Sequence, residues 1–550
     1  MIAAIRRLAT GENSLRSATV ILVATTLLSN ILGLLRDRFF AQKLPVDLLD
    51  TYFAAFRVPD LIFNILILGT VSAAFIPVFL EYRRKSEAEA WDVAHSAISL
   101  AILTMVVIAG LLFFALPTLV PYLVPDFSPA KQELTVSLAR ILLIQPVFFG
   151  LSYLFSGILN ALKRFFVYAI APLIYNLSII VATLFFVEDY GVTALAWGVV
   201  AGAFLHMFIQ FLAARSVGYR LVVRWNFSGP AIRKILRLMV PRSLGFGAWQ
   251  LTLVAFTAIA SSLGAGAVAA YNFADNIQTM PVAVFGLSFI TALYPTLATE
   301  YSAGNTREFA RLVWRGMRYL LVALVPAAFG LILLRAQVVR LILGTGYFGW
   351  DATVMTADTL GALALGMVTA ALSALLARSF YALHETRLPT LIQVGSFAVA
   401  IALGWWLAVP LELGVVGLAL GLAASTFLYT LLLYQRLRTR VPALREHEAG
   451  GRVLIGQLFV AALLLVLVVQ GAKYGVAQFV DMTRFWGVFV QTAVAIGAAV
   501  GIYWLVLARF GVPELDTVRA MVLRRISPER GAETLKTLGP EPQSLYDRQN

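Results

Sequence analysis

Charged residues at the end of a long apolar run are the first feature of this sequence that could do chemistry. Residues 29–40 read SNILGLLRDRFF, so Arg36, Asp37 and Arg38 end a stretch that is apolar enough to belong to a membrane-spanning helix. Ionised side chains are costly next to hydrocarbon, so these either anchor the helix at the interface, with a local ion pair to Asp37, or belong to a site. Gly33 lies on the same helical face as Arg36, which leaves room there for a ligand.

Two further polar stripes follow helical spacing inside apolar stretches. On the first, Arg57, Asp60 and Asn64 share a face where lipid contact would favour leucine. Arg57 and Asp60 are one turn apart, so a structural pair in which they neutralise each other is the alternative to a site. On the second stripe, Asp275 has no basic neighbour in sequence. It is therefore a candidate proton or cation site, or the partner of an arginine from elsewhere in the fold.

The residue types that catalysis and metal binding need are scarce. The chain has no cysteine and four histidines, which are scattered along the sequence. It also lacks the GxxxxGK[ST] loop that binds nucleotide phosphates. We therefore expect no catalytic residues, no metal and no cofactor. The connections between apolar runs on the expected outer side are short, which favours a protein that moves a substrate over an enzyme that modifies one.

The elements that position these residues are membrane-spanning helices. Hydrophobic residues make up 60% of the 550 residues, charged residues 13%, and the mean hydropathy is +0.84, far from the globular norm of about 25% charged residues. The expected fold is an all-α polytopic membrane protein. Its fourteen expected spans cover 17–43, 51–80, 93–118, 134–161, 166–187, 191–214, 241–263, 267–299, 316–343, 353–382, 387–409, 413–435, 453–472 and 485–508.

The distribution of lysine and arginine sets the expected orientation. Most of these residues fall in alternate connections and at the two ends of the chain, which predicts that both termini lie on the inner, cytoplasmic side of the membrane. The net charge of +14 is then explained by contact with anionic lipid rather than with nucleic acid. Residues 215–240 form the longest inner connection, which we interpret either as an amphipathic surface helix or as a basic linker.

An internal repeat divides the chain. Residues 52–82 align with 271–301 at a separation of 219, and the separation drifts only to 223 further along. Duplication predicts two six-helix bundles, residues 1–214 and 241–440, with a binding cavity between them. Two additional spans (450–510) lie outside the repeat, and the charged tail (511–550) is expected to be disordered.

Several stretches resemble one family. They are SNILGLLRDRFFAQKL, DTYFAAFRVPDLI, GTVSAAFIPVFLEY, GILNALKRF with APLIYNLSII, ADNIQTMPVAVFGLSFITALYPTLA and FYALHETRLPT. Together they are similar to the MurJ (MviN) lipid II flippases, within the multidrug/oligosaccharidyl-lipid/polysaccharide exporter superfamily. The resemblance implies a V-shaped cavity between two bundles and a lipid-tail groove at the last two spans. It also implies transport of undecaprenyl-pyrophosphate-linked peptidoglycan precursor from the inner to the outer leaflet.

The resemblance also assigns roles to the polar stripes. Where the family typically has arginine, this chain has Asn30, Phe63-Asn64 and Asn276. A pyrophosphate favours a cationic cavity, because arginine binds phosphate through charge-assisted, bidentate contacts. The expected substrate-binding residues are Arg36, Arg57, Arg38, Asn30, Asn64 and Asn276, and the expected conformational or coupling residues are Asp37, Asp60 and Asp275.

Other functions stay open at this point. One is a cation-coupled exporter of drugs or of another polyprenol-linked glycan, with Asp37 and Asp275 as coupling carboxylates. Another is a non-transporting scaffold that recruits cell-wall enzymes, and the weakest is a polyprenol glycosyltransferase. The expected partners of the flippase are lipid II, membrane lipids and cell-wall synthesis enzymes.

Overall fold

The computed structural model describes residues 15–68 and 74–514, and within these ranges it consists of helices without strands. The N-terminal half contains α2 (Leu15–Lys43), α3 (Val46–Ala55), α4 (Arg57–Phe63), the π-helix η1 (Asn64–Leu68), α5 (Ile76–Lys85), α6 (Glu87–Leu123), α7 (Pro129–Leu142), α8 (Gln145–Ala161), α9 (Phe165–Phe185), α10 (Val187–Tyr190) and α11 (Thr193–Ser216). The remainder contains α12 (Pro230–Ser261), α13 (Ala267–Pro281), the π-helix η3 (Val282–Leu287), α14 (Ser288–Ser302), α15 (Thr306–Leu343), α16 (Trp350–Ala382), α17 (Arg387–Ala408), α18 (Val415–Arg440), the 3-10 helix η4 (Pro442–His447), α19 (Glu448–Ala477) and α20 (Phe485–Arg509).

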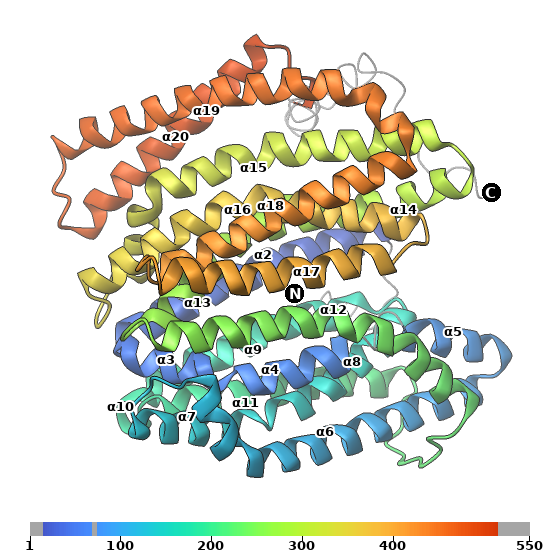
Figure 1. Cartoon of the computed structure of the whole chain (residues 1–550). Coiled ribbons are helices and arrows are strands. Elements are labelled where there is room, and N and C mark those ends of the chain that lie inside the picture. The colour runs from blue at the N-terminus through green and yellow to red at the C-terminus, as the bar shows by residue number, and fades with distance from the viewer. Residues whose placement is uncertain (1–14, 69–73, 515–550) are drawn as a thin grey trace. The chain divides into compact units, whose positions relative to one another are not determined.

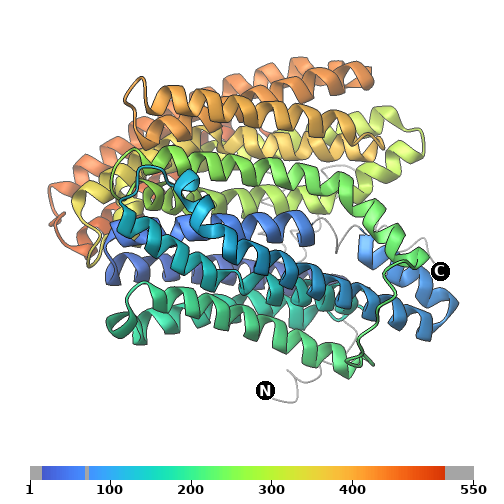
Figure 2. The ribbon, with the colours of Figure 1, turned by 60° about the horizontal axis from the view of Figure 1, so that its bottom comes forward.

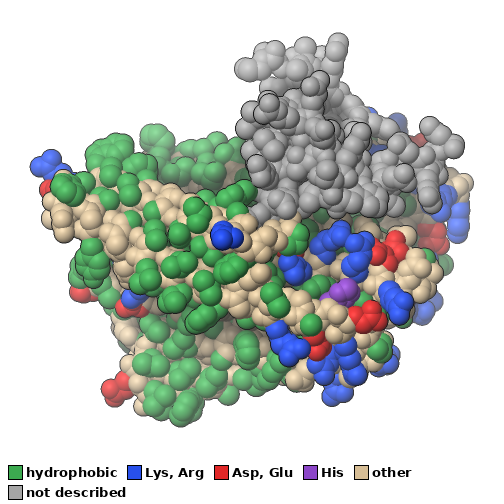
Figure 3. All heavy atoms as spheres, turned by 90° about the horizontal axis from the view of Figure 1, so that it is seen from above, with side chains coloured by type: hydrophobic (Ala, Val, Ile, Leu, Met, Phe, Trp, Pro, Cys, Tyr) green, Lys and Arg blue, Asp and Glu red, His purple; other side chains and the backbone are tan. Residues whose placement is uncertain are grey.

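The all-α, multi-span fold is confirmed, whereas the count of fourteen spans is not. Eleven helices in the described residues are long and apolar enough to cross a membrane. The other three expected spans fall on α2, on the segmented stretch from α3 to α5, and on α12, of which Gly247–Ser261 is a shorter apolar helix. Hydrophobic side chains cover much of the face shown in Figure 3, and lysine and arginine gather towards its right-hand end.

Prolines explain two interruptions that divide expected spans. Pro59 has no N–H, and its ring clashes with the carbonyl four residues earlier, at Ala55. The helix α3 ends at Ala55, and α4 starts at Arg57. Pro146 acts in the same way on Leu142, where α7 ends. The first of these breaks lies at Phe56, directly before Arg57.

The chain forms two compact units. Unit 1 comprises residues 1–280, 342–363 and 390–425, and unit 2 comprises residues 281–341, 364–389 and 426–550. Within unit 1, α9 packs between α2 and α11, and α11 also packs on α8; these helices run side by side in Figures 1 and 2. The units do not follow the limits of the repeat, and the predicted bundles 1–214 and 241–440 stay a prediction.

Unit 2 contains the two helices outside the repeat. The helices α19 and α20 pack against each other through alanine, leucine and valine side chains, with Leu334 of α15 in the same cluster. The hydroxyl of Tyr503 donates to the carbonyl oxygen of Val322 at 2.9 Å, which fixes α20 on α15. The outer surfaces of both helices stay apolar, with Phe459 70% exposed and Leu505 64% exposed, as contact with lipid requires.

Corresponding features recur in the two sequence copies. The π-helix η1 in the first copy and η3 in the second lie at positions about 219 residues apart. Gly191 and Gly414, separated by 223 residues, both have φ 57°, in the left-handed region that glycine adopts without a Cβ clash. These matched irregularities support the duplication inferred from sequence, because π-helices are rare and do not follow from hydrophobic pattern.

The long inner connection contains no separate surface helix. The backbone is irregular over residues 217–229, and α12 begins at Pro230 and continues to Ser261. Gly218, with φ 103°, ends the helical path after α11. Residues 230–240 of this connection thus belong to α12, and both interpretations of residues 215–240, an amphipathic helix on the membrane surface and a basic linker, stay predictions. The predicted disordered tail (511–550) lies outside the described residues from 515 onward.

Candidate functional site

Arg36 and Asp37 form an ion pair on α2. Arg36 donates from Nε at 3.1 Å and from Nη2 at 2.8 Å to Oδ1 of Asp37. The Asp37 side chain is only 2% exposed, against 18% for Arg36. A carboxylate buried to this degree needs its counter-charge and further hydrogen bonds.

Two asparagines complete this polar cluster. Asn276 on α13 donates from Nδ2 to Oδ2 of Asp37 at 2.8 Å. Asn176 on α9 accepts from Nη1 of Arg36 at 3.2 Å and donates to the hydroxyl of Ser29 at 3.3 Å. The cluster therefore joins helices from the first sequence copy to α13 of the second copy, all within unit 1.

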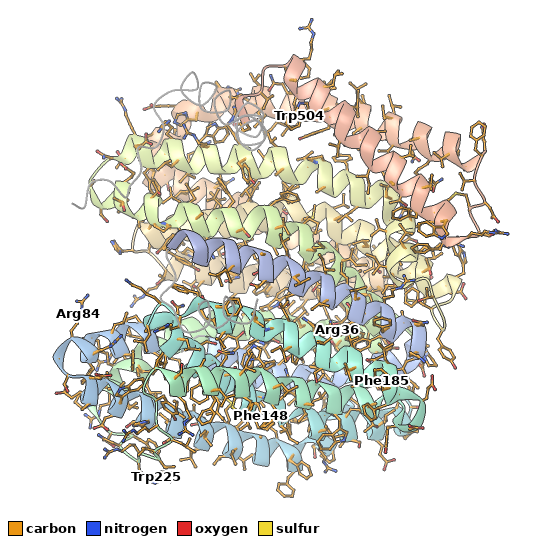
Figure 4. The ribbon with its side chains drawn as sticks, turned by 180° about the vertical axis from the view of Figure 1, so that it is seen from behind. Arg36, Arg84, Phe148, Phe185, Trp225 and Trp504 are labelled. Carbon is orange, nitrogen blue, oxygen red and sulfur yellow. The ribbon has the colours of Figure 1, made fainter. Side chains whose placement is uncertain are left out.

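A cavity of about 200 Å³ opens beside this cluster. Figure 4 shows that Arg36 lies nearer to the end of unit 1 that Phe185 marks than to the end that Arg84 marks. A Cβ added at Gly33 would contact no atom within 4 Å, so this helical face leaves open space. The charges of Arg36 and Asp37 cancel, and the amides add neutral donors. The lining residues are Ser29, Asn30, Gly33, Leu34, Arg36, Asp37, Asn176, Asn276, Thr279 and Met280.

Arg57 occupies a different polar site. Its side chain is buried, and it donates from Nε to the hydroxyl of Thr257 at 2.7 Å and from Nη2 to Oδ1 of Asn272 at 2.8 Å. Arg57 and Asp60 form no salt bridge among the described residues, so the local pair that the sequence offered as an alternative does not form. Arg57 thus links α4 to α12 and α13 through neutral partners.

The remaining predicted site residues do not line the cavity. Arg38 donates to the carbonyl oxygen of Ile342 at 3.2 Å, in the last turn of α15, where a cation stabilises a helix end. Asn64 donates to the backbone oxygen of Asp60 in its own helical segment at 2.8 Å. Asp275 accepts from the side chain of Gln278 at 3.2 Å. The structure therefore brings together four of the nine predicted residues: Arg36, Asp37, Asn30 and Asn276.

Sequence reasoning missed a buried carboxylate near the first turn of α13. Asp50 on α3 has no exposed surface, and its two oxygens accept from the backbone N–H of Gly266 at 2.6 Å and of Ala269 at 2.8 Å. Lys131 approaches it to 3.9 Å and pairs more closely with Asp47, at 2.5 Å. The spacing of Asp47 and Asp50 does not predict this contact, because the N–H groups that Asp50 accepts from lie 216 and 219 residues later in the chain.

No group of three histidine, aspartate or glutamate side chains that could hold a metal ion occurs within residues 15–68 and 74–514. The arrangement is suited instead to binding an anion. Arg36 has N–H groups that are not engaged by Asp37 or Asn176, and Asn30 and Asn276 bring amide donors to the same cavity. Such N–H groups can donate hydrogen bonds to a charged head group.

Relatives with similar sequences carry one name. A Burkholderia cenocepacia protein named lipid II flippase MurJ is 30% identical over 456 residues, which cover 80% of this chain and 86% of the relative. A Rhizobium meliloti protein named probable lipid II flippase MurJ is 29% identical over 526 residues, covering 92% and 97%.

Solved structures share the fold. A structure titled "Lipid II flippase MurJ, inward closed conformation" has a TM-score of 0.73 at 21% identity, covering 89% of this chain and 99% of that chain. An inward-facing multidrug resistance transporter of the MATE family has a TM-score of 0.66 at 15% identity, covering 78% and 99%. The model of the family described as lipid II flippase MurJ matches residues 44–494 of this sequence. Since that match spans most of the chain, the protein belongs to the MurJ lipid II flippase family of multi-span membrane transporters.

Proposed function

We propose that this protein moves lipid II, the undecaprenyl-pyrophosphate-linked peptidoglycan precursor, from the inner to the outer leaflet of the bacterial inner membrane. The observation that carries the proposal is the cavity beside Arg36, in a chain whose family match extends over residues 44–494. Both termini face the cytoplasm in this proposal, as the distribution of basic residues predicts. An exporter of drugs or of another glycan, and a scaffold without transport, are not favoured by the names of the relatives.

The pyrophosphate binds at Arg36. Three of its N–H groups go to Asp37 and Asn176, which leaves two for the substrate. Asn30 and Asn276 line the same cavity and supply neutral donors at positions where the family typically has arginine. Without substrate, Asp37 supplies the negative charge beside Arg36. A bound pyrophosphate supplies that charge instead, so Asp37 and the substrate compete for the guanidinium of Arg36.

Alternating access separates helices of the first copy from helices of the second. In unit 1 these are joined by the hydrogen bonds of Asn276 to Asp37 and of Arg57 to Asn272. Opening breaks both contacts, so these residues set the balance between the two conformations. The carboxylates of Asp60, one helical turn from Arg57, and of Asp275, one turn after its partner Asn272, serve as the coupling groups.

The lipid tail lies along the last two helices, α19 and α20. The apolar outer surfaces of α19 and α20 suit a polyprenyl chain, since Phe459 and Leu505 expose most of their side chains. Cell-wall synthesis enzymes receive the product on the outer side and are the expected protein partners.

Complementation of a strain depleted of its own lipid II flippase tests the function. The wild-type chain, Arg36→Ala and Arg57→Ala are compared at equal expression and membrane insertion, with outer-leaflet lipid II measured directly. Arg140→Ala is the matched control, because Arg140 stacks on Phe113 and donates to its carbonyl oxygen, away from the cavity. We expect rescue by the wild type and the control and loss in both other variants. A well-inserted wild type that leaves lipid II on the inner leaflet would overturn the proposal.

A further inference from the structure

A second cavity lies at the end of unit 1 where three connections of the first copy meet. It has a volume of about 410 Å³ and is lined by Arg83 at the last turn of α5, by Lys163 and Arg164 between α8 and α9, and by Ser216 and Val217 after α11. Three of its lining residues are cations, and none is acidic. It shares no residue with the cavity beside Arg36.

The three cations have no counter-ion in the described part of the chain. Neither Arg83, Lys163 nor Arg164 forms a salt bridge there, whereas Lys234 pairs with Glu81 at 2.5 Å and Arg224 pairs with Asp92 at 3.1 Å. Nη1 of Arg164 is buried without a hydrogen-bond partner. Positively charged side chains that face one cavity without a counter-ion repel each other, so a bound anion would stabilise the arrangement.

The backbone holds Lys163 in this cavity at a conformational cost. The helix α8 ends in a Schellman motif, in which Lys163 N–H donates to Asn160 at 3.0 Å and Arg164 N–H donates to Leu159 at 2.7 Å. The left-handed residue of this motif is usually glycine, yet Lys163 adopts it with φ 58°. Lys163 therefore occupies a position where glycine would adopt the backbone conformation at a lower energetic cost.

The second copy contains the same motif with a different charge. His384, 221 residues later, has φ 59°, and the N–H of Glu385 donates to Phe380 at 3.0 Å. Glu385 replaces Arg164, and Arg440, the counterpart of Val217, lies 3.6 Å from the Glu385 carboxylate. The second copy thus supplies its own counter-ion. The excess of positive charge in the first copy is not a requirement of the helical turn.

We propose that this cavity binds the phosphate of an anionic phospholipid in the leaflet that it faces. Phosphate accepts several charge-assisted hydrogen bonds at once, which suits two arginines and a lysine. Basic pockets between membrane helices are a common form of head-group site. In the orientation of the proposed function, on which this assignment of leaflet rests, the lipid belongs to the inner leaflet.

Lipid binding by the purified full-length chain tests the proposal. Dioleoyl phosphatidylglycerol is titrated in detergent, retained lipid is counted by native mass spectrometry, and phosphatidylcholine and sodium phosphate are titrated in parallel. The variants are Lys163→Gly and Arg164→Gln, with Arg84→Ala as the matched control. Arg84 follows Arg83 in sequence, is exposed, does not line the cavity and projects from the end of α5 (Figure 4).

We expect the affinity for phosphatidylglycerol to fall by about tenfold in each of the two cavity variants and to stay within about twofold in Arg84→Ala. Lys163→Gly relieves the left-handed strain, so its unfolding midpoint without lipid should equal or exceed that of the wild type. This separates lost binding from lost folding.

Three results would overturn the proposal: equal loss in Arg84→Ala, equal binding of phosphatidylcholine, or occupancy by sodium phosphate that phosphatidylglycerol cannot displace. The last would identify a site for free phosphate. The assay involves no lipid II transport and exposes both ends of the protein. Its outcome is therefore independent of whether the chain acts as a flippase.

Discussion

The contact between Asp50 and the first turn of α13 makes a quantitative prediction. Replacing Asp50 by alanine leaves the backbone N–H groups of Gly266 and Ala269 without their acceptor in a buried place. Loss of a helix-capping side chain costs about 1 kcal/mol, and a buried unsatisfied donor costs about 1–3 kcal/mol. We expect Asp50→Ala to weaken this contact by about 3 kcal/mol. Asp50→Asn, which keeps one acceptor oxygen, should weaken it by about half as much.

Because the contact joins α3 of the first copy to α13 of the second, weakening it favours the conformation in which these helices have separated. A change of about 3 kcal/mol raises the separated fraction roughly 150-fold, and half that change raises it roughly tenfold. The chain has no cysteine, so Ala269→Cys provides a single thiol that is buried in the closed contact. The rate at which a maleimide labels this thiol reports the separated fraction.

Asp47→Ala is the matched control for this experiment. It removes an acidic residue one turn earlier on α3, but the partner of Asp47 is Lys131 of the same copy, in a partly exposed ion pair. Such pairs contribute about 0–1 kcal/mol, so labelling should rise less than fivefold. A second thiol at Ala196, buried in α11, reports global unfolding. Labelling that is no faster in Asp50→Ala than in Asp47→Ala, or that rises equally at both thiols, would refute this reasoning.

Three further predictions concern the same helices. Arg36→Ala should lower the free energy of unfolding by about 3–5 kcal/mol, because it leaves the buried Asp37 unpaired. Adding Asp37→Ala should restore the unfolding midpoint, measured by tryptophan fluorescence, but should not restore flipping. Asn276→Arg brings a cation into the cavity at a family arginine position and should raise the affinity for a soluble pyrophosphate-lipid analogue by about tenfold in direct titration; an unchanged affinity would contradict the assignment of Asn276. A Cβ added at Gly266 would lie 3.3 Å from Cβ of Val46, which is close to the Cβ–Cβ distance of a disulfide. The oxidised variant Val46→Cys/Gly266→Cys should therefore stop flipping, and reductant should restore it. Full activity after complete oxidation would show that this contact need not open.

Much of the fold could be predicted from the sequence, because apolar runs of membrane-spanning length have few structures open to them. The polar stripe with Arg36 was visible for the same reason, since a charge in such a run has to be satisfied by protein. The sequence does not show which residues form hydrogen bonds with these charged side chains. Arg57 and Asp60 are one turn apart, yet Arg57 bonds to Thr257 and Asn272, some 200 and 215 residues away.

The span count and the inner connection show the other limit. Pro59 divides an expected span into short helices, so its apolar length is not one helix. Residues 215–240 have an amphipathic composition, but the backbone between Gly218 and the Gly229-Pro230 pair is irregular, and α12 begins only at Pro230. Composition reports which residues suit an interface, whereas glycine and proline decide which backbone they adopt.

The polar contacts between the two copies in unit 1 pair a charge with a dipole. The first copy provides the charged groups, which are the carboxylates of Asp37 and Asp50 and the guanidinium of Arg57. Their partners in the second copy are neutral: an amide, a hydroxyl and a backbone N–H group. The energy of an ion and a dipole falls with the square of their separation, faster than that of two ions. The attraction between the copies therefore acts over a short range and nearly vanishes once water enters. Movement beyond the first ångströms meets little electrostatic resistance, and its rate should depend only weakly on ionic strength.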